Sequence, residues 1–401
     1  MPVSRRGFLR FPGVSDAPFS GAVLSARGLE AHLAEAQQGQ GQRARPVLPP
    51  GVDEIRISSN ENPLGPGKVA LDAILGKFPE AGRYPFNSTP LDSDLVAAIA
   101  ARHKIKTENV TMGAGSQEIL KNSMRAFVTP QRGLVTALPT FENPTNYARR
   151  HNLPVTEVRV DAALRLDVEP MIAAGSAGAG LVFFNNPNNP TATVHGEKTV
   201  TDMVERIRKA SPETVILIDE AYHEYVTDPA YATAIPLALA TPNVLVARTF
   251  SKAYGMAGMR IGYAVGTAET VKKLALFKMP YNVSVFAVAA AIASLNDTKH
   301  IENERRRNTA VRAFTVKALQ DMGAKPADSQ GNFLFVDIGR PAKEFRDACA
   351  KAGVMVGRDF PPFEKTHCRI SIGTMDEMKR AVEVFRSVLR PITTSAQKGV
   401  R

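Results

Sequence analysis

Two residues suited to chemistry stand directly after apolar, β-branched runs. Asp219 follows the run Val215–Ile218, and Lys252 lies five residues beyond the run Val244–Ala247. A deprotonated amine is a nucleophile toward carbonyl carbon and a general base, while a carboxylate can stabilise a nearby cation. Taken singly both signals are weak, because aspartates often cap the next helix and most lysines are surface residues.

Three loops rich in small or polar residues add to these two. The loop Gly113–Gln117 opens a predicted helix, where backbone N–H groups form a phosphate cradle. The loop Asn185–Thr191 carries two Asn-Pro pairs, which indicate a turn first and a binding site second. The segment Lys252–Arg260 holds glycines that permit a close approach to a ligand.

These loops need a scaffold, and the periodicity of the chain from Gly51 onward supplies one. The predicted strands are 109–112, 134–137, 155–160, 181–184, 215–218, 244–247 and 260–265. Helices are predicted at 95–103, 117–127, 198–209 and 271–277. Alternating strands and helices predict an α/β fold with a large, doubly wound, mostly parallel sheet. Ligands bind beyond the carboxyl ends of such strands, where each motif falls.

The remainder predicts a smaller α+β unit built from both chain ends. A long helix at 301–322 precedes strands at 333–338 and 369–372 and helices at 344–352 and 377–389. We therefore expect an N-terminal arm at 1–50, part of the small domain at 51–80, the large domain at 81–295, the rest of the small domain at 296–392, and a tail at 393–401.

In this order the motifs resemble the fold-type-I, pyridoxal-5′-phosphate (PLP)-dependent aminotransferases of class I/II, and within them the histidinol-phosphate aminotransferase-like branch. The resemblance covers about residues 55–390. Further motifs of this branch are Asn60-Glu61-Asn62-Pro63-Leu64-Gly65-Pro66, Arg83-Tyr84-Pro85, Pro139-Thr140-Phe141, Gly331-Asn332-Phe333, Val356-Gly357-Arg358-Asp359 and Arg369-Ile370-Ser371-Ile372-Gly373.

The resemblance implies roles for the residues around the ring of the cofactor. Lys252 would bind the PLP aldehyde covalently and shuttle the substrate proton. Asp219 would pair with the pyridinium nitrogen and keep the ring an electron sink. Asn189 and Tyr222 would hydrogen-bond the ring 3-oxygen, and Phe141 would stack on the ring face.

The same resemblance implies which residues bind the two anionic groups, the phosphate of PLP and the α-carboxylate of the substrate. Ser116, Gln117, Ser251 and Arg260 would hold the phosphate of PLP. Tyr84 would reach that phosphate from the neighbouring subunit, which implies a homodimer with shared active sites. Arg369 would hold the substrate α-carboxylate through a two-pronged contact that lysine cannot reproduce.

The substrate follows less directly. Asn62 and Leu64 belong to the substrate-side motif, but the family commonly has a tyrosine where Leu64 stands. Thr191-Ala192 replaces the usual Thr-Gly, and Arg358 is a candidate for holding a distal anion. The implied reaction moves an amino group between histidinol phosphate or an aromatic amino acid and a 2-oxoacid such as 2-oxoglutarate. Alternatives are a PLP decarboxylase of a phosphorylated hydroxy-amino acid and a non-catalytic PLP-fold binding protein.

Charge and cysteine usage indicate no further partner. The net charge is +11, but the one dense run, Arg305-Arg306-Arg307, fits a solvated helix face better than a nucleic-acid patch. The two cysteines, Cys349 and Cys368, have no metal-ligand spacing, so we expect no metal site. No apolar run is long enough to span a membrane.

The N-terminus resembles a twin-arginine export signal. Ser4-Arg5-Arg6-Gly7-Phe8-Leu9-Arg10 is followed by a weakly apolar stretch, Phe19–Leu33, and by a small-x-small site, Ala34-Glu35-Ala36. Pro12, Asp16, Pro18 and Arg27 leave no clean apolar region of the kind a signal peptide has, and the alternative is a disordered basic arm of a cytoplasmic protein. We favour export to the periplasm, because the motif is complete and this route carries folded, cofactor-loaded proteins.

Overall fold

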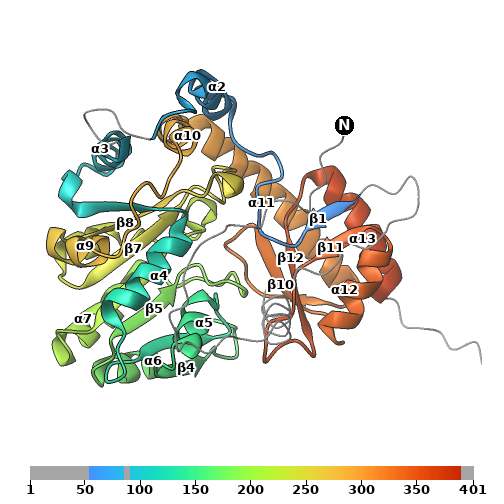
Figure 1. Ribbon diagram of the computed structural model, residues 1–401. Coiled ribbons are helices and arrows are strands. Elements are labelled where there is room, and N and C mark those ends of the chain that lie inside the picture. Colours follow the sequence, from blue (N-terminus) through green and yellow to red (C-terminus); the bar gives the residue numbers. More distant parts are fainter. Residues whose placement is uncertain (1–53, 85–90, 390–401) are drawn as a thin grey trace, which may run out of the picture. The chain divides into compact units, whose positions relative to one another are not determined.

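The computed structural model describes residues 54–84 and 91–389 (Figure 1). The twin-arginine motif and the C-terminal tail lie outside these residues. The strands are β1 (Ile55–Ile57), β2 (Val110–Gly113), β3 (Leu134–Leu138), β4 (Val155–Arg159), β5 (Leu181–Asn185), β6 (Val215–Asp219), β7 (Val244–Thr249), β8 (Gly262–Gly266), β9 (Lys325–Pro326), β10 (Phe333–Asp337), β11 (Val354–Val356) and β12 (His367–Ser371).

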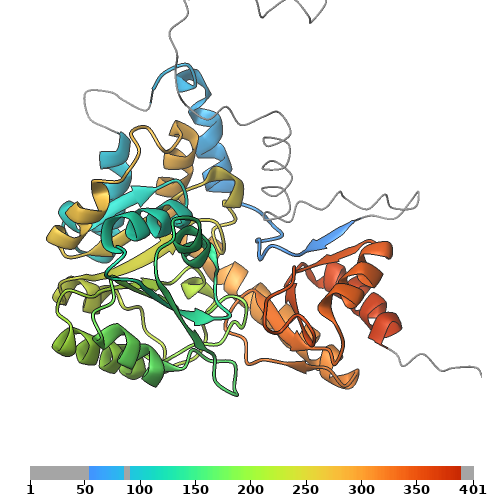
Figure 2. The same cartoon turned by 60° about the horizontal axis from the view of Figure 1, so that its bottom comes forward.

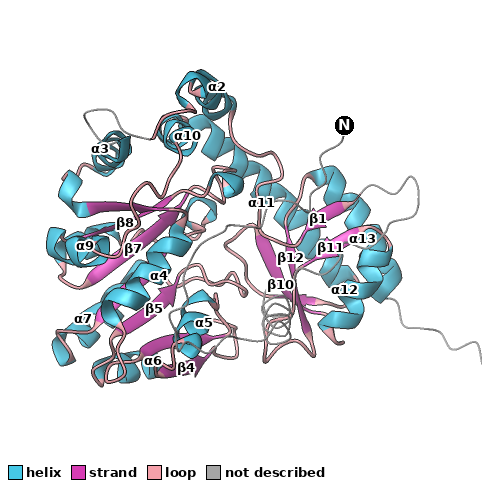
Figure 3. Cartoon of the chain, in the orientation of Figure 1, coloured by secondary structure: helices cyan, strands magenta, loops and turns pink. Residues whose placement is uncertain are grey.

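Helices alternate with these strands through most of the chain (Figure 3). They are α2 (Lys68–Gly76), α3 (Leu91–His103), α4 (Ser116–Phe127), α5 (Asn143–Arg150), α6 (Val168–Ser176), α7 (Glu197–Ala210), α8 (Ile235–Ala240), α9 (Ala268–Ala275), α10 (Val285–Asn296), α11 (Thr298–Asp321), α12 (Ala342–Lys351) and α13 (Met375–Leu389). Short 3₁₀ turns occupy Phe78–Glu80, Thr107–Asn109, His223–Tyr225 and Ala257–Met259.

The central element is a seven-stranded sheet in the order β2-β8-β7-β6-β5-β3-β4. Strand β8 runs antiparallel to both neighbours, and the pairs from β7 to β4 are parallel. The sheet is therefore mostly parallel, and the predicted α/β fold class is confirmed. Strand β8 begins at Gly262 rather than at residue 260, because Arg260 takes a left-handed conformation with φ +56° that ends strand pairing.

Both faces of this sheet are covered, which explains why its strands are apolar almost throughout. Val182 and Ile216 join the core under α6, α7, α8 and α10, whereas Leu181 and Leu217 join the core under α4 and α9. Successive side chains of a strand point to opposite faces of the sheet, so each strand contributes side chains to both cores. The turned view in Figure 2 shows the same helices beside the sheet.

A second core forms around two small sheets. Strand β10 pairs antiparallel with β12 and β9, and β1 pairs in parallel with β11. Ile55 and Ile57 of β1 pack here with residues of α11, α12 and α13, so a segment from the start of the described chain completes a C-terminal core. Helix α2 behaves differently: Ala70 belongs to the core of the large sheet, although we expected 51–80 in the smaller unit. The predicted domain limits otherwise stay predictions.

Within residues 54–84 and 91–389, no helix has both the length and the apolar character needed to cross a bilayer. In the same part of the chain, no group of three or more His, Cys, Asp and Glu side chains is arranged to hold a metal ion. Cys349 and Cys368 are buried free thiols.

Candidate active site

The amine of Lys252 lies on the loop between β7 and the turn at Ala257–Met259. Its Nζ donates to the Ser59 carbonyl oxygen over 3.2 Å and stands 5.6 Å from the centre of the Tyr222 ring. Partial burial of the side chain, together with repulsion from Arg369, lowers the pKa of Lys252 to about 8. About a tenth of this amine is therefore neutral at pH 7, and the neutral form is the one that acts as a nucleophile and general base.

Asp219 ends β6, and only 3% of it is exposed. One carboxylate oxygen accepts the backbone N–H of Ala221 over 3.2 Å. Burial raises the pKa of Asp219 to about 7, and the neighbouring carboxylate of Glu220 adds to this. A buried carboxylate with a raised pKa is stabilised by a cationic N–H donor, which is what a protonated pyridine nitrogen offers.

The hydroxyl of Tyr222 accepts a hydrogen bond from Asn60 Nδ2 over 3.1 Å. Asn60 is 1% exposed, and its Oδ1 accepts from the hydroxyl of Ser371 over 2.7 Å. Through Asn60, these two hydrogen bonds link Ser371 of β12 in the second core to Tyr222, three residues after the end of β6. Sequence reasoning quoted Asn60 and Ser371 only as family motifs and assigned neither a contact. Asn60 has a left-handed conformation with φ +54°, which asparagine tolerates, so the residue type was the local signal in the sequence.

Small residues shape the cradle at the N-terminus of α4. A Cβ added at Gly262 would lie 2.5 Å from the backbone nitrogen of Ser116, and one added at Gly115 would lie 2.5 Å from Arg260 Nη2. The same Arg260 nitrogen approaches Gln117 Oε1 at 3.4 Å. The structure thus brings together the helix N-terminus and guanidinium predicted to hold a phosphate. Ser251, 8% exposed, precedes Lys252 on the adjoining loop.

Arg369 enters from β12 and is 6% exposed. Its Nη1 donates to Asn189 Oδ1 over 2.8 Å and its Nη2 to the Ser58 carbonyl over 2.6 Å. Its Nε is buried without a hydrogen-bond partner in the described structure. Burial lowers the pKa of Arg369 to about 10, with the charge of Arg358 contributing. This charged N–H without a partner can donate to an anionic ligand.

The asparagine loop that holds Asn189 is built from buried polar contacts. Asn188 accepts from the Thr140 hydroxyl over 2.7 Å and donates to the Pro139 carbonyl over 3.1 Å. Ala192 closes the loop with φ +59°, a conformation that glycine adopts with less strain. The positive φ explains why the family usually has glycine at this position, and in this chain Ala192 adopts the same conformation with more backbone strain.

The remaining predicted residues lie around this centre. Phe141 is half-buried and packs against the core beneath α4 and α5. Asn62 donates to the Ala253 carbonyl over 3.0 Å, whereas Leu64 is 61% exposed. Arg358 forms an ion pair with Glu142, a residue that sequence reasoning did not single out. Tyr84 is 77% exposed and contacts Tyr281, so this chain alone does not bring it to the cradle.

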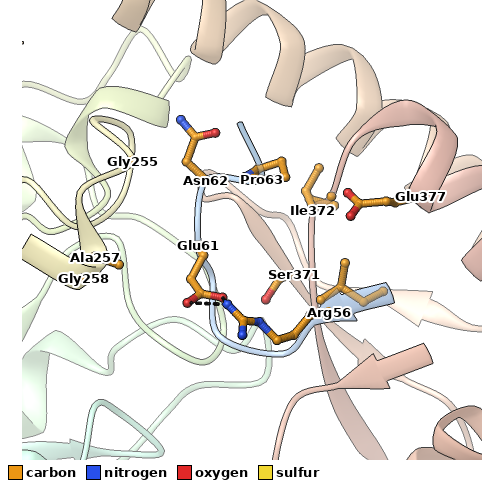
Figure 4. A pocket seen from close by; sticks show the side chains of 12 residues that line it. Arg56, Glu61, Asn62, Pro63, Gly255, Ala257, Gly258, Ser371, Ile372 and Glu377 are labelled. Carbon is orange, nitrogen blue, oxygen red and sulfur yellow. Dashed lines mark hydrogen bonds and ion pairs between the residues drawn. The ribbon is translucent and has the colours of Figure 1, made fainter. Parts of the chain in front are cut away.

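A cavity of about 300 Å³ is bounded on one side by Gly255, Ala257 and Gly258, which follow Lys252 in the chain (Figure 4). Its walls include Arg56, Glu61, Asn62, Gly255, Ala257, Ser371 and Glu377. Arg56 donates to Glu61 across it over 3.1 Å. Lys252, Asp219 and Arg369 do not line this cavity.

The comparisons with known proteins agree with this geometry. Residues 52–385 match the family model "Aminotransferase class I and II". The chain belongs to the class I and II aminotransferases. A histidinol-phosphate aminotransferase of Moorella thermoacetica is 33% identical over 84% of this chain and 86% of its own, and that of Symbiobacterium thermophilum is 33% identical over 84% and 91%.

A solved histidinol-phosphate aminotransferase from Sinorhizobium meliloti, in complex with pyridoxal-5′-phosphate, superposes with a TM-score of 0.78. It is 27% identical and covers 96% of this chain and 99% of its own. The present protein is a PLP-dependent transaminase. Its residues fit that cofactor. The buried carboxylate of Asp219 and the amine of Lys252, whose pKa is lowered, share one site with the N-terminus of α4, where the absence of a side chain at Gly262 leaves room for a phosphate.

Proposed function

We propose that this aminotransferase transfers an amino group from an amino acid or amine to a 2-oxoacid such as 2-oxoglutarate, with Lys252 as the catalytic base. The first candidate donors are histidinol phosphate, named in its relatives, and aromatic amino acids. One observation carries the proposal: the amine of Lys252, with its pKa lowered to about 8, shares a site with Asp219 and with the unpartnered Nε of Arg369.

Each predicted residue has a task toward PLP. Asp219 would pair with the ring nitrogen, Asn189 and Tyr222 would contact the ring 3-oxygen, and Phe141 would cover a ring face. Ser116, Gln117, Ser251 and Arg260 would hold the phosphate. When bound, PLP supplies an electron sink for the carbon that loses its proton.

The reaction then depends on what the side chains do. Arg369 would bind the substrate carboxylate in the plane of its guanidinium group and so fix the Cα–H bond near Lys252. The Lys252 amine would take the Cα proton and return it, a task that needs a neutral amine at working pH. The carbonyl of Ser59 would orient this amine through its hydrogen bond at 3.2 Å.

The decisive experiment uses the PLP-loaded protein with candidate donors and several 2-oxoacids. We expect amino transfer that requires a 2-oxoacid and releases no carbon dioxide. Lys252→Ala should abolish turnover and change the visible absorbance of the bound cofactor. Carbon dioxide release without a 2-oxoacid would reject the proposal in favour of a decarboxylase. No turnover together with unchanged cofactor absorbance in Lys252→Ala would indicate a binding protein instead.

We also infer a homodimer with shared active sites. The large apolar side chains that are exposed in the described chain fall into two segments: Leu64, Val69, Leu71, Leu75, Phe78 and Tyr84, and Leu276, Met279 and Tyr281. The first segment contains α2, which packs against α10 (Figure 1). Apolar patches of this kind are typically covered by a partner, and Tyr84 lies at the end of one segment.

A mixing experiment tests both the dimer and the role of Tyr84. Lys252→Ala and Tyr84→Ala variants should each be poorly active alone. In a mixed dimer whose sites are shared, one site receives both defects and the other receives none, so activity should return after the subunits are exchanged. Absence of recovery despite exchange would place Tyr84 in its own subunit's site. A monomer in sedimentation would reject the dimer.

For the compartment we propose periplasmic export by the twin-arginine route, with the cytoplasm as the alternative. The support is the motif Ser4–Arg10 in the sequence. Cell fractionation of the wild type and of an Arg5→Lys/Arg6→Lys variant tests it. We expect the wild type in the periplasm with a shortened N-terminus and the variant in the cytoplasm. An intact N-terminus in the cytoplasm for both would reject export.

A further inference from the structure

An acidic side chain engages the arginine expected to bind a second anion. Glu142, the residue before α5, forms an ion pair with Arg358, which follows β11 in the second core. The other terminal nitrogen of Arg358 donates to the Asp359 carbonyl over 3.2 Å. The carboxylate of Asp359 is itself paired with Arg346. Glu142 therefore supplies the negative charge that balances Arg358.

This ion pair lies next to the group that would bind the substrate carboxylate. The ring of Phe360 has the guanidinium of Arg358 at 4.1 Å from its centre and that of Arg369 at 4.9 Å. Arg358 lowers the pKa of Arg369, while Glu142 acts in the opposite direction. A ligand held by Arg369 is thus close enough to experience the charges of both Arg358 and Glu142.

The second oxygen of Glu142 is buried without a partner in the described part of the chain. Glu142 Oε2 is inaccessible to water and has no hydrogen-bond donor among the described residues. Such an oxygen is stabilised by an N–H or O–H group and destabilised by a second anion. A phosphate dianion held by Arg369 would bring a second negative charge into the electrostatic field of Glu142, which already acts on Arg369. A single carboxylate on Arg369 would not.

We propose that Glu142 is a specificity-determining residue that makes this enzyme prefer donors with an α-carboxylate over phosphorylated amino alcohols. The inference rests on the proposed aminotransferase function and selects between its two candidate donor classes. Because Glu142 neutralises Arg358, the guanidinium of Arg369 is the remaining positive charge for the substrate anion. An anion with a single negative charge, such as a carboxylate, balances that charge. The preferred donors are therefore α-amino acids, in contrast to the substrate in the relatives' names.

Histidine and histidinol phosphate form a matched donor pair, because both carry the same imidazole and amine and differ in the anion. We expect the PLP-loaded wild type to have a kcat/KM for histidine or an aromatic amino acid at least about tenfold above that for histidinol phosphate. Glu142→Gln keeps the shape and removes the charge, and it should shift this ratio toward histidinol phosphate by about tenfold or more. Pyruvate and 2-oxoglutarate are each used as acceptor, so that acceptor choice does not decide the result.

Glu157→Gln is the matched control. Glu157 forms an ion pair with Arg149 of α5 at 2.8 Å and is also partly exposed, so its loss should leave the donor ratio unchanged. Glu142 is only partly buried, and thermal unfolding should verify that both variants fold. A wild type that prefers histidinol phosphate, or a Glu142→Gln ratio equal to that of the control, would overturn the inference.

A binding measurement keeps the inference separate from the proposed function. Calorimetry of inorganic phosphate with the PLP-loaded protein should show about tenfold tighter binding in Glu142→Gln than in the wild type. Arg358→Gln should bind phosphate more weakly than Glu142→Gln. Equal phosphate affinity in wild type and Glu142→Gln would reject the role of Glu142. Failure of every donor to react would reject the proposed function, but the phosphate measurement would still stand.

Discussion

Arg369 Nη1 donates to Asn189 Oδ1 over 2.8 Å, although 180 residues separate them in the chain. This hydrogen bond joins the arginine proposed to bind the substrate carboxylate to the asparagine proposed to contact the cofactor ring. Because Asn189 lies at the carboxyl edge of the large sheet and Arg369 on β12, the bond also connects the two cores. With the proposed roles, this one contact would couple substrate binding to cofactor orientation.

The pKa of Lys252 predicts how PLP uptake depends on pH. Only the neutral amine can attack the cofactor aldehyde, and the folded-state pKa is about 8. In cofactor-free protein we expect the uptake rate to rise about tenfold per pH unit below pH 8 and to level off above it. Stopped-flow absorbance between pH 6 and pH 9 measures this. A midpoint near the ordinary lysine value would contradict the lowered pKa.

Asp219→Asn should stabilise the cofactor-free protein while impairing the enzyme. The pKa of Asp219 is raised from 3.8 to about 7, so the folded state binds this proton more tightly than the unfolded state. The free energy of unfolding then falls as pH rises from about 4 to about 7 and stays lowered above that range. The variant lacks this fall and should be more stable by about 2–4 kcal/mol at pH 8, with little difference at pH 4.

Denaturant titrations of both proteins at the two pH values test this. Parallel stability profiles would show that the Asp219 carboxylate is not destabilised by burial. The same substitution should lower turnover by roughly 100-fold or more, because the carboxylate no longer balances the charge on the ring nitrogen. We therefore expect Asp219→Asn to be more stable and less active than the wild type, which is the usual trade-off between stability and activity at an active site.

A buried ion network behind the site should contribute strongly to folding. Arg248, 4% exposed, contacts Glu220 and Glu224, each at 2.9 Å. Arg248→Met would leave two buried carboxylates without their cation, and we expect a loss of about 3–5 kcal/mol in the free energy of unfolding. Arg206→Met is the control: its pair with Glu169 is exposed to solvent, so its removal should change the free energy of unfolding far less. Similar losses in both variants would disprove the network's role.

Gly262→Ala tests the phosphate cradle. The new Cβ would lie 2.5 Å from the Ser116 nitrogen, which must move away and so displace the first N–H groups of α4. We expect PLP affinity to fall by about 10-fold or more, measured by equilibrium titration of cofactor-free protein. Gly258→Ala is the control, since a Cβ there meets nothing within 4 Å. Unchanged affinity in Gly262→Ala would show that the phosphate is held elsewhere.

Much of the scaffold could be predicted from local sequence. Strands such as Val215–Ile218 are continuous apolar runs, because both faces of the sheet are covered, and the polar residue after each run marks its carboxyl end. Helix α10 escaped prediction, since it is apolar on all sides and shows no amphipathic period. The antiparallel direction of β8 was also missed, because strand direction is set by pairing partners and not by composition.

The sequence by itself determined the cofactor chemistry: Lys252 and Asp219 follow predicted strands, and the parallel sheet brings strand ends to one edge. The tertiary structure alone decided which distant groups meet there. The contact of Asn60 with Tyr222 and the ion pair of Glu142 with Arg358 join segments that carry no mutual sequence signal. Such contacts depend on how two separately built cores pack, and packing is a property of the whole chain rather than of any local pattern.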